Sequence, residues 1–286
     1  LFSLLGTAAS NAYPGPFCSC ENCCRAWELG GRSLRRRSAA LINDDLLIDL
    51  GPDIMTASHV FGLPLTKVRY VLQTHPHADH IDLSHLNSRS PAFGVVGAPR
   101  LQWFMTEETK QLARRTFQRD LSGYDLASSE GIEALNMTIE TIRPLEQFSC
   151  GSYRITPLPA NHAPGKGAVL YAVEEPELGV AVLYGTDTGV FFDEAWEGIQ
   201  AHGLRFDVVI LDHTYGPDGS GSGHMNAAEV ADHVARMRRD DILKPDGRAV
   251  ATHISHDENP VYPELAAIAE SGGYEAGYDG MQIEIG

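Results

Sequence analysis

The chain has 286 residues and a formal net charge of −16, from 38 acidic and 22 basic side chains, which argues against a broad footprint on nucleic acid. Its 43% hydrophobic and 21% charged residues are a globular balance that excludes a disordered chain. Its apolar runs are shorter than the roughly 20 residues of a membrane helix, so we expect neither a nucleic-acid nor a membrane partner.

The N-terminal region combines an apolar start with a cluster of cysteines. We interpret residues 1–6 as a first β-strand rather than a secretory signal. Cys18, Cys20 and Cys23 follow in C-x-C-x-x-C spacing, where a tight turn can aim three sulfurs at one ion, whereas Cys24 is poorly placed beside Cys23. Five cysteines, four of them clustered, fit metal ligation in a reducing compartment better than disulfides. We therefore predict a cytoplasmic location. The alternative to metal ligation by these cysteines is a reduced, metal-free thiol cluster.

Short β-type runs recur along the chain, several of them near-continuous hydrophobic stretches typical of a sheet covered on both faces. The predicted strands lie in residues 1–5, 38–42, 45–51, 68–75, 153–160, 168–174, 179–187, 207–214 and 247–255. Helical patterns occupy residues 98–121 and 225–241, the second with Asn226 near its start. This organisation predicts a layered α/β or α+β chain, and we expect one domain over residues 1–286.

Between these elements lie two polar segments. The run Arg35, Arg36 and Arg37 is interpreted first as a solvated turn. The glycine-rich segment 216–224 is interpreted as a mobile surface loop rather than a domain boundary.

The segment THPHADHID presents His75, His77, Asp79 and His80 directly after a predicted strand. Buried imidazoles and carboxylates need partners, and a divalent cation can supply them. Alternate residues of an extended segment face one side, so His75, His77 and Asp79 can converge while His80 turns toward a second ion. Further candidate ligands stand at the ends of later strands: His162, Asp187 and His253.

This order of motifs resembles the metallo-β-lactamase-fold hydrolase superfamily, from LLGTAAS near the N-terminus to THISH near the C-terminus. The resemblance implies an α/β fold, an αββα sandwich with two metals at one edge of the paired sheets. It implies one metal on His75, His77 and His162. It implies a second metal on Asp79, His80 and His253, with Asp187 bridging the pair. Zinc, manganese and iron all suit such ligands.

Within the superfamily, the early cysteine motif, LLGTAAS and SLRRRSAALI resemble the cyclic phosphodiesterases of the carbon–phosphorus lyase pathway. The resemblance implies hydrolysis of small phosphate diesters, cyclic ones among them, by a metal-bridging hydroxide. It also implies a structural zinc on Cys18, Cys20 and Cys23 closed by a downstream histidine, which we assign to His224. A homodimer, common in such proteins, is a further expectation.

Phosphodiester hydrolysis also needs a proton for the leaving alkoxide. His213 and His256 are the candidate general acids, with a positioning role as the alternative for each. Asp79 is expected to orient the attacking water or accept its proton. Two other functions stay open: a lactone or thioester hydrolase of the same fold, and a non-enzymatic accessory similar to pyrroloquinoline quinone biosynthesis protein B.

Overall fold

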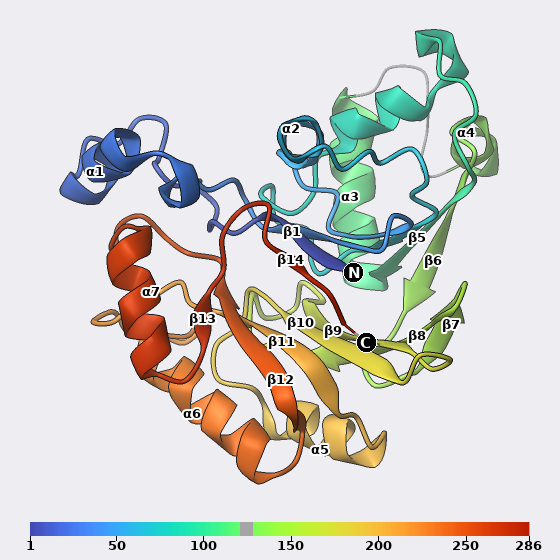
Figure 1. Ribbon diagram of the computed structural model, residues 1–286. Helices are drawn as coiled ribbons and strands as arrows, with labels where there is room; N and C mark the ends of the chain where they lie inside the picture. The colour runs from blue at the N-terminus through green and yellow to red at the C-terminus, as the bar shows by residue number, and fades with distance from the viewer. Residues whose placement is uncertain (121–127, 286) are drawn as a thin grey trace.

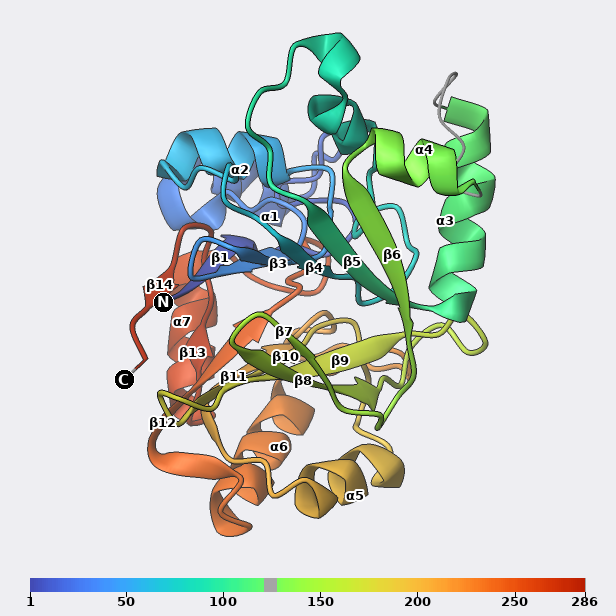
Figure 2. The same ribbon diagram turned by 90° about the vertical axis from the view of Figure 1, so that its right-hand side faces the viewer.

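The computed structural model describes residues 1–120 and 128–285, and it contains two seven-stranded mixed sheets packed face to face (Figures 1 and 2). Helices cover the outer face of each sheet, so the layers are α, β, β and α, as predicted. None of the described helices combines the length and apolar character needed to cross a membrane.

The first sheet is built mainly from the N-terminal half of the chain. Its strands, in spatial order, are β14 (Gln282–Ile283), β1 (Phe2–Gly6), β2 (Ala39–Ile42), β3 (Leu46–Ile48), β4 (Tyr70–Leu72), β5 (Leu101–Thr106) and β6 (Met137–Ile142). The pairs from β14 to β3 are antiparallel, and those from β3 to β6 are parallel.

The second sheet comes from the C-terminal half. Its strands, in spatial order, are β13 (Glu275–Ala276), β12 (Leu243–Thr252), β11 (Phe206–Asp212), β10 (Val180–Gly185), β9 (Val169–Glu175), β8 (Tyr153–Pro159) and β7 (Phe148–Cys150). Strands β13 to β10 pair in parallel, and β10 to β7 pair antiparallel.

The described residues form seven α-helices beside the sheets. They are α1 (Glu21–Leu29), α2 (Ile54–Phe61), α3 (Glu107–Asp120), α4 (Ser129–Ala134), α5 (Asp193–Ala201), α6 (Ala227–Arg239) and α7 (Tyr262–Ser271). Short 3-10 helices span Gly31–Ser33, Leu83–Arg89 and Pro91–Phe93. Helices α2, α3 and α4 lie on the side of the first sheet, and α5, α6 and α7 on the side of the second, while α1 lies at one end of the sandwich (Figures 1 and 2).

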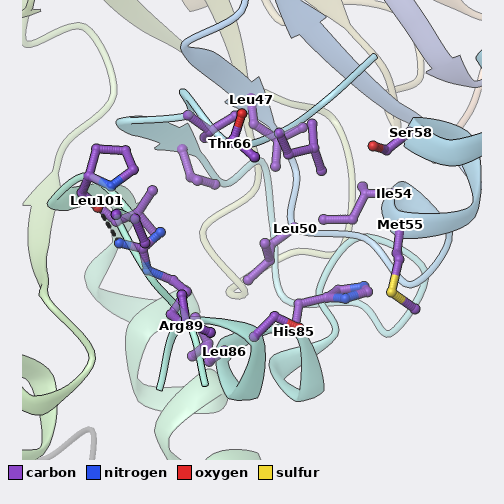
Figure 3. A pocket seen from close by; sticks show the side chains of 18 of the residues that line it. Leu47, Leu50, Ile54, Met55, Ser58, Thr66, His85, Leu86, Arg89 and Leu101 are labelled. Carbon is purple, nitrogen blue, oxygen red and sulfur yellow. Dashed lines mark hydrogen bonds between the residues drawn. The ribbon is translucent and has the colours of Figure 1, made fainter. Parts of the chain in front are cut away.

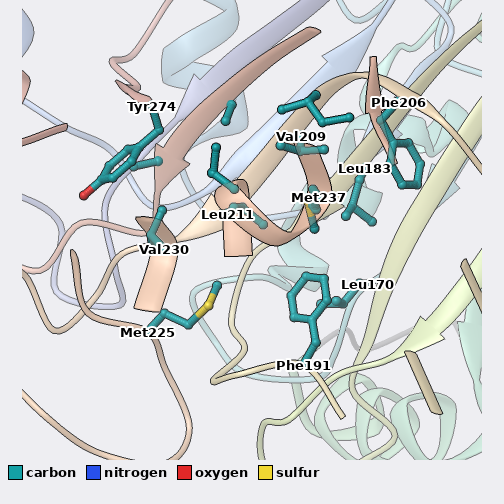
Figure 4. Packing of buried hydrophobic residues seen from close by; sticks show 14 of the residues in the cluster. Leu170, Leu183, Phe191, Phe206, Val209, Leu211, Met225, Val230, Met237 and Tyr274 are labelled. Atoms are coloured by element: carbon teal, nitrogen blue, oxygen red, sulfur yellow. The ribbon is translucent and has the colours of Figure 1, made fainter. Parts of the chain in front are cut away.

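Strand β11 is continuously hydrophobic because both of its faces are buried. Val208 and Ile210 face the first sheet and belong to the core between the sheets. Val209 and Leu211 face the other way and pack with Met237 of α6 in the outer cluster (Figure 4). Because successive side chains of a strand alternate between faces, a strand buried on both sides needs an apolar residue at each position.

The predicted helix over residues 225–241 is confirmed as α6. Asn226 caps it: its side chain accepts from the backbone N–H of Glu229, whose carboxylate accepts from the Asn226 N–H in return. This reciprocal pair satisfies two of the free donors at the helix start.

The predicted helix over residues 98–121 is wrong in its first part, because Leu101–Thr106 forms β5. Trp103 and Met105 pack under the outer helices, whereas Phe104 faces the core between the sheets. This alternation of large side chains is a strand pattern, and α3 begins only at Glu107. Residue 121 lies outside the described residues.

The arginine run is not a solvated turn. Arg35 is only 3% exposed, and its guanidinium donates to Thr7 Oγ1 at 2.8 Å and to the Gly277 carbonyl at 2.6 Å. Arg37 makes a bidentate pair with Asp53. These contacts tie the segment before β2 to β1, to the start of α2 and to the C-terminal region.

Candidate metal centre

The candidate ligands lie on loops that leave the strands at one edge of the sandwich. His75, His77, Asp79 and His80 follow β4, and His162 follows β8. Asp187 follows β10, and His253 follows β12 with the same left-handed backbone, at φ values of 50° and 57°. Non-glycine residues in this region of φ are uncommon and gather at functional sites.

These side chains converge in two groups. One group is His75, His77 and His162; the other is Asp79, His80, Asp187 and His253. Within each group, the potential ligand atoms lie within 4.8 Å of one another. The structure therefore brings together all seven residues predicted from the sequence, in the predicted partition.

Asp187 lies between the groups. Its Oδ1 is 3.7 Å from His162 Nε2 in the first group. Its Oδ2 is 2.5 Å from His80 Nε2 and 3.2 Å from His253 Nε2 in the second. A carboxylate with one oxygen toward each group can bridge two cations.

Hydrogen bonds at the far side of the rings set which nitrogen faces the centre. His80 Nδ1 lies 2.6 Å from Asp49 Oδ2, and His162 Nδ1 lies 3.2 Å from the Gly223 carbonyl. Both oxygens accept, so Nδ1 carries a proton and Nε2 is the ring nitrogen that faces the centre. Histidines that bind metals through one nitrogen are oriented in this way through the other.

Buried atoms without hydrogen-bond partners mark the middle of the centre. They are His75 Nε2, His80 Nε2, Asp187 Oδ2 and His253 Nε2. Each lies within ion-pair distance of another member, but none makes a contact with the angles of a hydrogen bond. Buried polar atoms are rarely left in this state, and divalent cations are the partners that such nitrogens and oxygens accept.

The members of the centre differ in their ionisation. Burial lowers the pKa of His75, with nearby His80 acting in the same direction. Burial alone would raise the pKa of Asp187, but the surrounding imidazoles, His253 first, outweigh it and hold that pKa well below its usual range. Burial alone would lower the pKa of His80 and of His253, but the carboxylates around them, Asp187 first, outweigh it and raise both pKa values. Asp187 and His75 are thus in the unprotonated forms that bind metals, whereas a cation would displace the protons that His80 and His253 hold.

The carboxylate of Asp49 stabilises the loop after β4 that carries four of the candidate ligands. Its buried carboxylate accepts from Gln73 Nε2 at 2.9 Å and from the N–H of Thr74 at 2.8 Å, besides its contact with His80. Gln73 also donates to the carbonyls of His75 and His80. This network fixes the loop, as expected for a partner of a ligand rather than a ligand.

His224 is not with the cysteines, and its assignment as their fourth ligand is corrected. Its Nδ1 lies 3.0 Å from Asp212 Oδ2 and 3.5 Å from Asp187 Oδ1. The ring stacks on that of His253 at 5.3 Å and tilts toward that of His162 at 4.9 Å. The glycine-rich loop therefore delivers His224 to the rim of the metal centre.

His256 takes the place expected of His224. Cys18, Cys20, Cys23 and His256 form a third group, with potential ligand atoms within 4.8 Å of one another. His256 Nδ1 lies 3.8 Å from Cys20 Sγ, so the prediction of His256 as general acid is also corrected. His256 reaches the cysteine group because it lies three residues after His253, on the loop that passes the N-terminal segment.

Backbone N–H groups surround the sulfurs of this group. The N–H of Gly15 donates to Cys23 Sγ, that of Cys20 donates to Cys18 Sγ, and that of Cys23 donates to Cys20 Sγ. The hydrogen bond from Cys20 lowers the pKa of the Cys18 thiol, whereas burial raises that of Cys23 to about 12. Three sulfurs and one imidazole are a ligand set that zinc binds in closed tetrahedral sites.

His213 does not reach the metal centre, which corrects its assignment as general acid. The side chain is fully buried, with Nδ1 at 2.9 Å from Asn259 Oδ1 and Nε2 at 2.8 Å from the Tyr274 hydroxyl. Both ring nitrogens are occupied, so His213 joins the loop after β11 to the segments before and after α7.

The part of the chain that carries most of these residues matches a known protein family. A family model described as a β-lactamase superfamily domain matches residues 45–254, well over half of the chain. No curated protein matches it.

Several solved structures share the fold over almost their whole length. A diphosphatase from the PhnP family has 20% identity and a TM-score of 0.75, covering 100% of this chain and 97% of its own. Zn²⁺-bound PqqB from Methylobacterium extorquens has 21% identity and a TM-score of 0.70, covering 99% of each chain. The short form of human tRNase Z has 18% identity and a TM-score of 0.62, covering 100% and 99%. At these identities, the similarity establishes the fold.

Proposed function

Since the chain belongs to the β-lactamase superfamily, we propose that it is a binuclear metal-dependent phosphodiesterase of small phosphate diesters, cyclic ones among them. The observation that carries the proposal is the pair of ligand groups that share Asp187, with buried nitrogens and oxygens that lack hydrogen-bond partners. The similarity to a diphosphatase of the PhnP family supports the choice of phosphate chemistry.

His75, His77 and His162 would hold one divalent cation, and Asp79, His80 and His253 the other, with Asp187 between them. Zinc or manganese, with iron as a third candidate, would supply Lewis-acid activation of water and neutralisation of phosphate charge. Asp79, a member of the second group and 8% exposed, would orient the attacking water or accept its proton.

His224 is the group proposed to protonate the leaving alkoxide. Asp212 accepts from its Nδ1, and among the described residues no partner occupies Nε2. Asp212 is itself held by the N–H groups of Thr214 and Met225. A carboxylate behind the imidazole fixes the direction of the ring, while Nε2 stays available to the substrate.

A cationic hollow of about 250 Å³ beside the first ligand group supports an anionic substrate. Lys166 and Arg115 line it together with His77, and Lys166 Nζ lies 3.0 Å from His77 Nε2. In a chain with a net charge of −16, two cations next to a metal centre are a local exception. They favour phosphate esters over neutral lactones.

The test is a substrate panel on metal-reconstituted protein, with manganese and zinc compared. We expect turnover of bis(p-nitrophenyl) phosphate and of a ribose cyclic phosphate at rates at least tenfold above that of a lactone or thioester. Faster turnover of the lactone or thioester would reassign the enzyme to those bonds. Full metal content without turnover of any substrate would favour the non-enzymatic accessory role.

A further inference from the structure

A second hollow, of about 340 Å³, lies on the outer face of the first sheet, and none of its lining residues belongs to the two metal groups (Figure 3). It lies between α2 and the segment 83–99, which contains two short 3-10 helices. Leu50 lies in the middle of the view, with Ile54 and Met55 of α2 on one side and Arg89 on the other. Its floor and walls are mainly aliphatic.

The charge of this hollow differs from that of the whole molecule. The chain has 38 acidic residues, yet none of the described residues that line the hollow is Asp or Glu. Arg89 is the one lysine or arginine among the lining residues that the structure describes. The hollow is therefore an apolar space with a single permanent cation at its wall.

Arg89 is held in place without being neutralised. Its Nε donates to the Leu135 carbonyl at 3.4 Å, and its Nη2 donates to the carbonyls of Asn136, at 3.2 Å, and Pro99. In the part of the chain that the structure describes, no carboxylate lies within ion-pair distance of it. Burial lowers the pKa of this guanidinium, and no neighbouring acid counters the shift. A half-buried cation in this state gains most from an anion brought in from outside.

We propose that the hollow binds a small amphiphilic monocarboxylate, such as a medium-chain fatty acid, with its carboxylate on Arg89 and its apolar chain against Leu50 and Ile54. The Nη1 group of Arg89, which has no hydrogen-bond partner among the described residues, remains available to a carboxylate, and the aliphatic lining matches a hydrocarbon chain. The volume lies at the small end of the range of ligand sites, about 300–1,000 Å³, so the ligand is small. This site is independent of the proposed catalytic function.

A second copy of the chain is a less fitting occupant. Two copies, each with a net charge of −16, repel one another. The features that complement the hollow are one negative charge and a short apolar body, which one small molecule supplies together.

The test is calorimetric titration of the metal-loaded protein with octanoate, octan-1-ol and octylamine, which share a chain and differ in head group. We expect saturable 1:1 binding of octanoate, at least tenfold tighter than that of octanol, and no binding of octylamine. Arg89→Met should remove the preference for octanoate, whereas Arg100→Met should not. Arg100 is the matched control because it is exposed, pairs with Glu133 and does not line the hollow.

Because Arg89 also holds backbone carbonyls, a second variant fills the hollow and leaves Arg89 in place. Ser58→Phe, on the α2 wall, should reduce octanoate binding at least tenfold while the protein stays folded by circular dichroism. Octanoate binding that survives Ser58→Phe and is displaced by acetate would locate the carboxylate at the metal centre and overturn the proposal. Equal affinity for octanoate and octanol, no binding of either, or dimerisation that Ser58→Phe abolishes, would also overturn it.

Discussion

At the scale of single residues, His224 occupies a position at the rim of the metal centre, with its side chain 19% exposed and Asp212 behind it. A proton donor matters most when the departing alkoxide is a strong base, because a good leaving group departs without help. The dependence of the rate on the leaving group is therefore the property that separates a proton donor from a positioning residue.

We expect His224→Ala to lower kcat by about 10²–10⁴-fold for an alkyl phosphodiester and much less for bis(p-nitrophenyl) phosphate. The measurement is steady-state kinetics of both substrates at equal metal content. His202→Ala, at an exposed histidine after α5, is the control and should leave both rates unchanged. An equal loss for the two substrates would assign His224 to positioning.

For Asp187→Ala we expect loss of turnover together with loss of bound metal, since the methyl group cannot replace a carboxylate that contacts both ligand groups. Metal analysis of the purified variant checks this. Asp232→Ala, an exposed position on α6, is the matched control and should keep both metals. Two metals and a normal rate in the Asp187 variant would contradict the bridging role.

The sequence was sufficient to find the seven residues of the centre because their motifs are local and end recognisable strands. It misplaced three histidines. His213 follows β11 as a ligand would, but its surroundings, Asn259 and Tyr274, come from distant parts of the chain. His224 and His256 exchanged their expected places because the paths of their loops depend on tertiary packing. The spacing of THISH, with histidines three apart, was the available sign that His256 continues from the ligand loop.

At the scale of elements, the loop after β12 connects two centres. His253 belongs to the second metal group, and three residues later His256 meets the cysteines before and within α1. Asn22 of α1 also donates to the His256 carbonyl at 3.1 Å. A metal in the cysteine group would therefore join the N-terminal segment to this loop.

We expect Cys20→Ser to lose one zinc per chain and to melt roughly 5–10 °C lower, as a loss of a few kcal/mol implies for a chain of this size. The two metals of the catalytic centre should remain. Elemental analysis and thermal melting measure these effects, and Cys24→Ser is the control because Cys24 is exposed and lies outside the group. Wild-type protein with only two metals and four freely titrating thiols would contradict the zinc site.

The C-terminal turn is attached to the first sheet through Asp279. Thr7 donates to its carboxylate at 2.7 Å and the backbone N–H of Arg36 at 2.6 Å. Burial nevertheless raises the pKa of Asp279 from 3.8 to about 6. The folded state thus holds this proton more tightly than the unfolded state does, and the resulting stability is lost as the pH rises from about 4 to about 6.

We expect the difference in unfolding free energy between wild type and Asp279→Asn to fall over that interval, because the variant cannot titrate there. Urea denaturation of both proteins at several pH values provides the measurement. Asp241→Asn, at an exposed position paired with Arg205, should show no such change. A constant difference from pH 4 to 7 would contradict the raised pKa.

The elements that the sequence predicted are those with long apolar runs, such as β9 to β12. Strands β13 and β14 contain two residues each and carry no detectable pattern. Strand β5 was taken for helix because it runs directly into α3 without a turn residue. The burial of Arg35 could not be predicted because its acceptors include the Gly277 carbonyl, far away in sequence.

At the scale of the whole molecule, each candidate metal group combines residues from the half of the chain that builds the first sheet with residues from the half that builds the second sheet. His75 and His77 precede the second sheet in sequence, and His162 follows its second strand. Bound metals would therefore stabilise the packing of one half against the other.

We expect removal of the metals by a chelator to lower the melting temperature, and restoring them to raise it in a concentration-dependent way. A ligand at 100 times its Kd adds about 2.7 kcal/mol, which gives a shift of several degrees. Differential scanning calorimetry checks this, and in Asp187→Ala the part of the shift that comes from the two groups around Asp187 should vanish, leaving only the part due to zinc on the cysteine group. A melting temperature independent of metal in the wild type would contradict the role of the ions in joining the halves.

The division of each metal group between the two halves of the chain also affects the order in which its ligands are synthesised. Synthesis proceeds from the N-terminus, so the THPHADHID motif leaves the ribosome long before His253, and Cys18, Cys20 and Cys23 long before His256. Strand β1 likewise gains its partner β14 only when residues 282–283 have been added. Until then the nascent chain presents incomplete ligand groups and an open sheet edge, so correct loading with metal has to wait until His253 and His256 have been made.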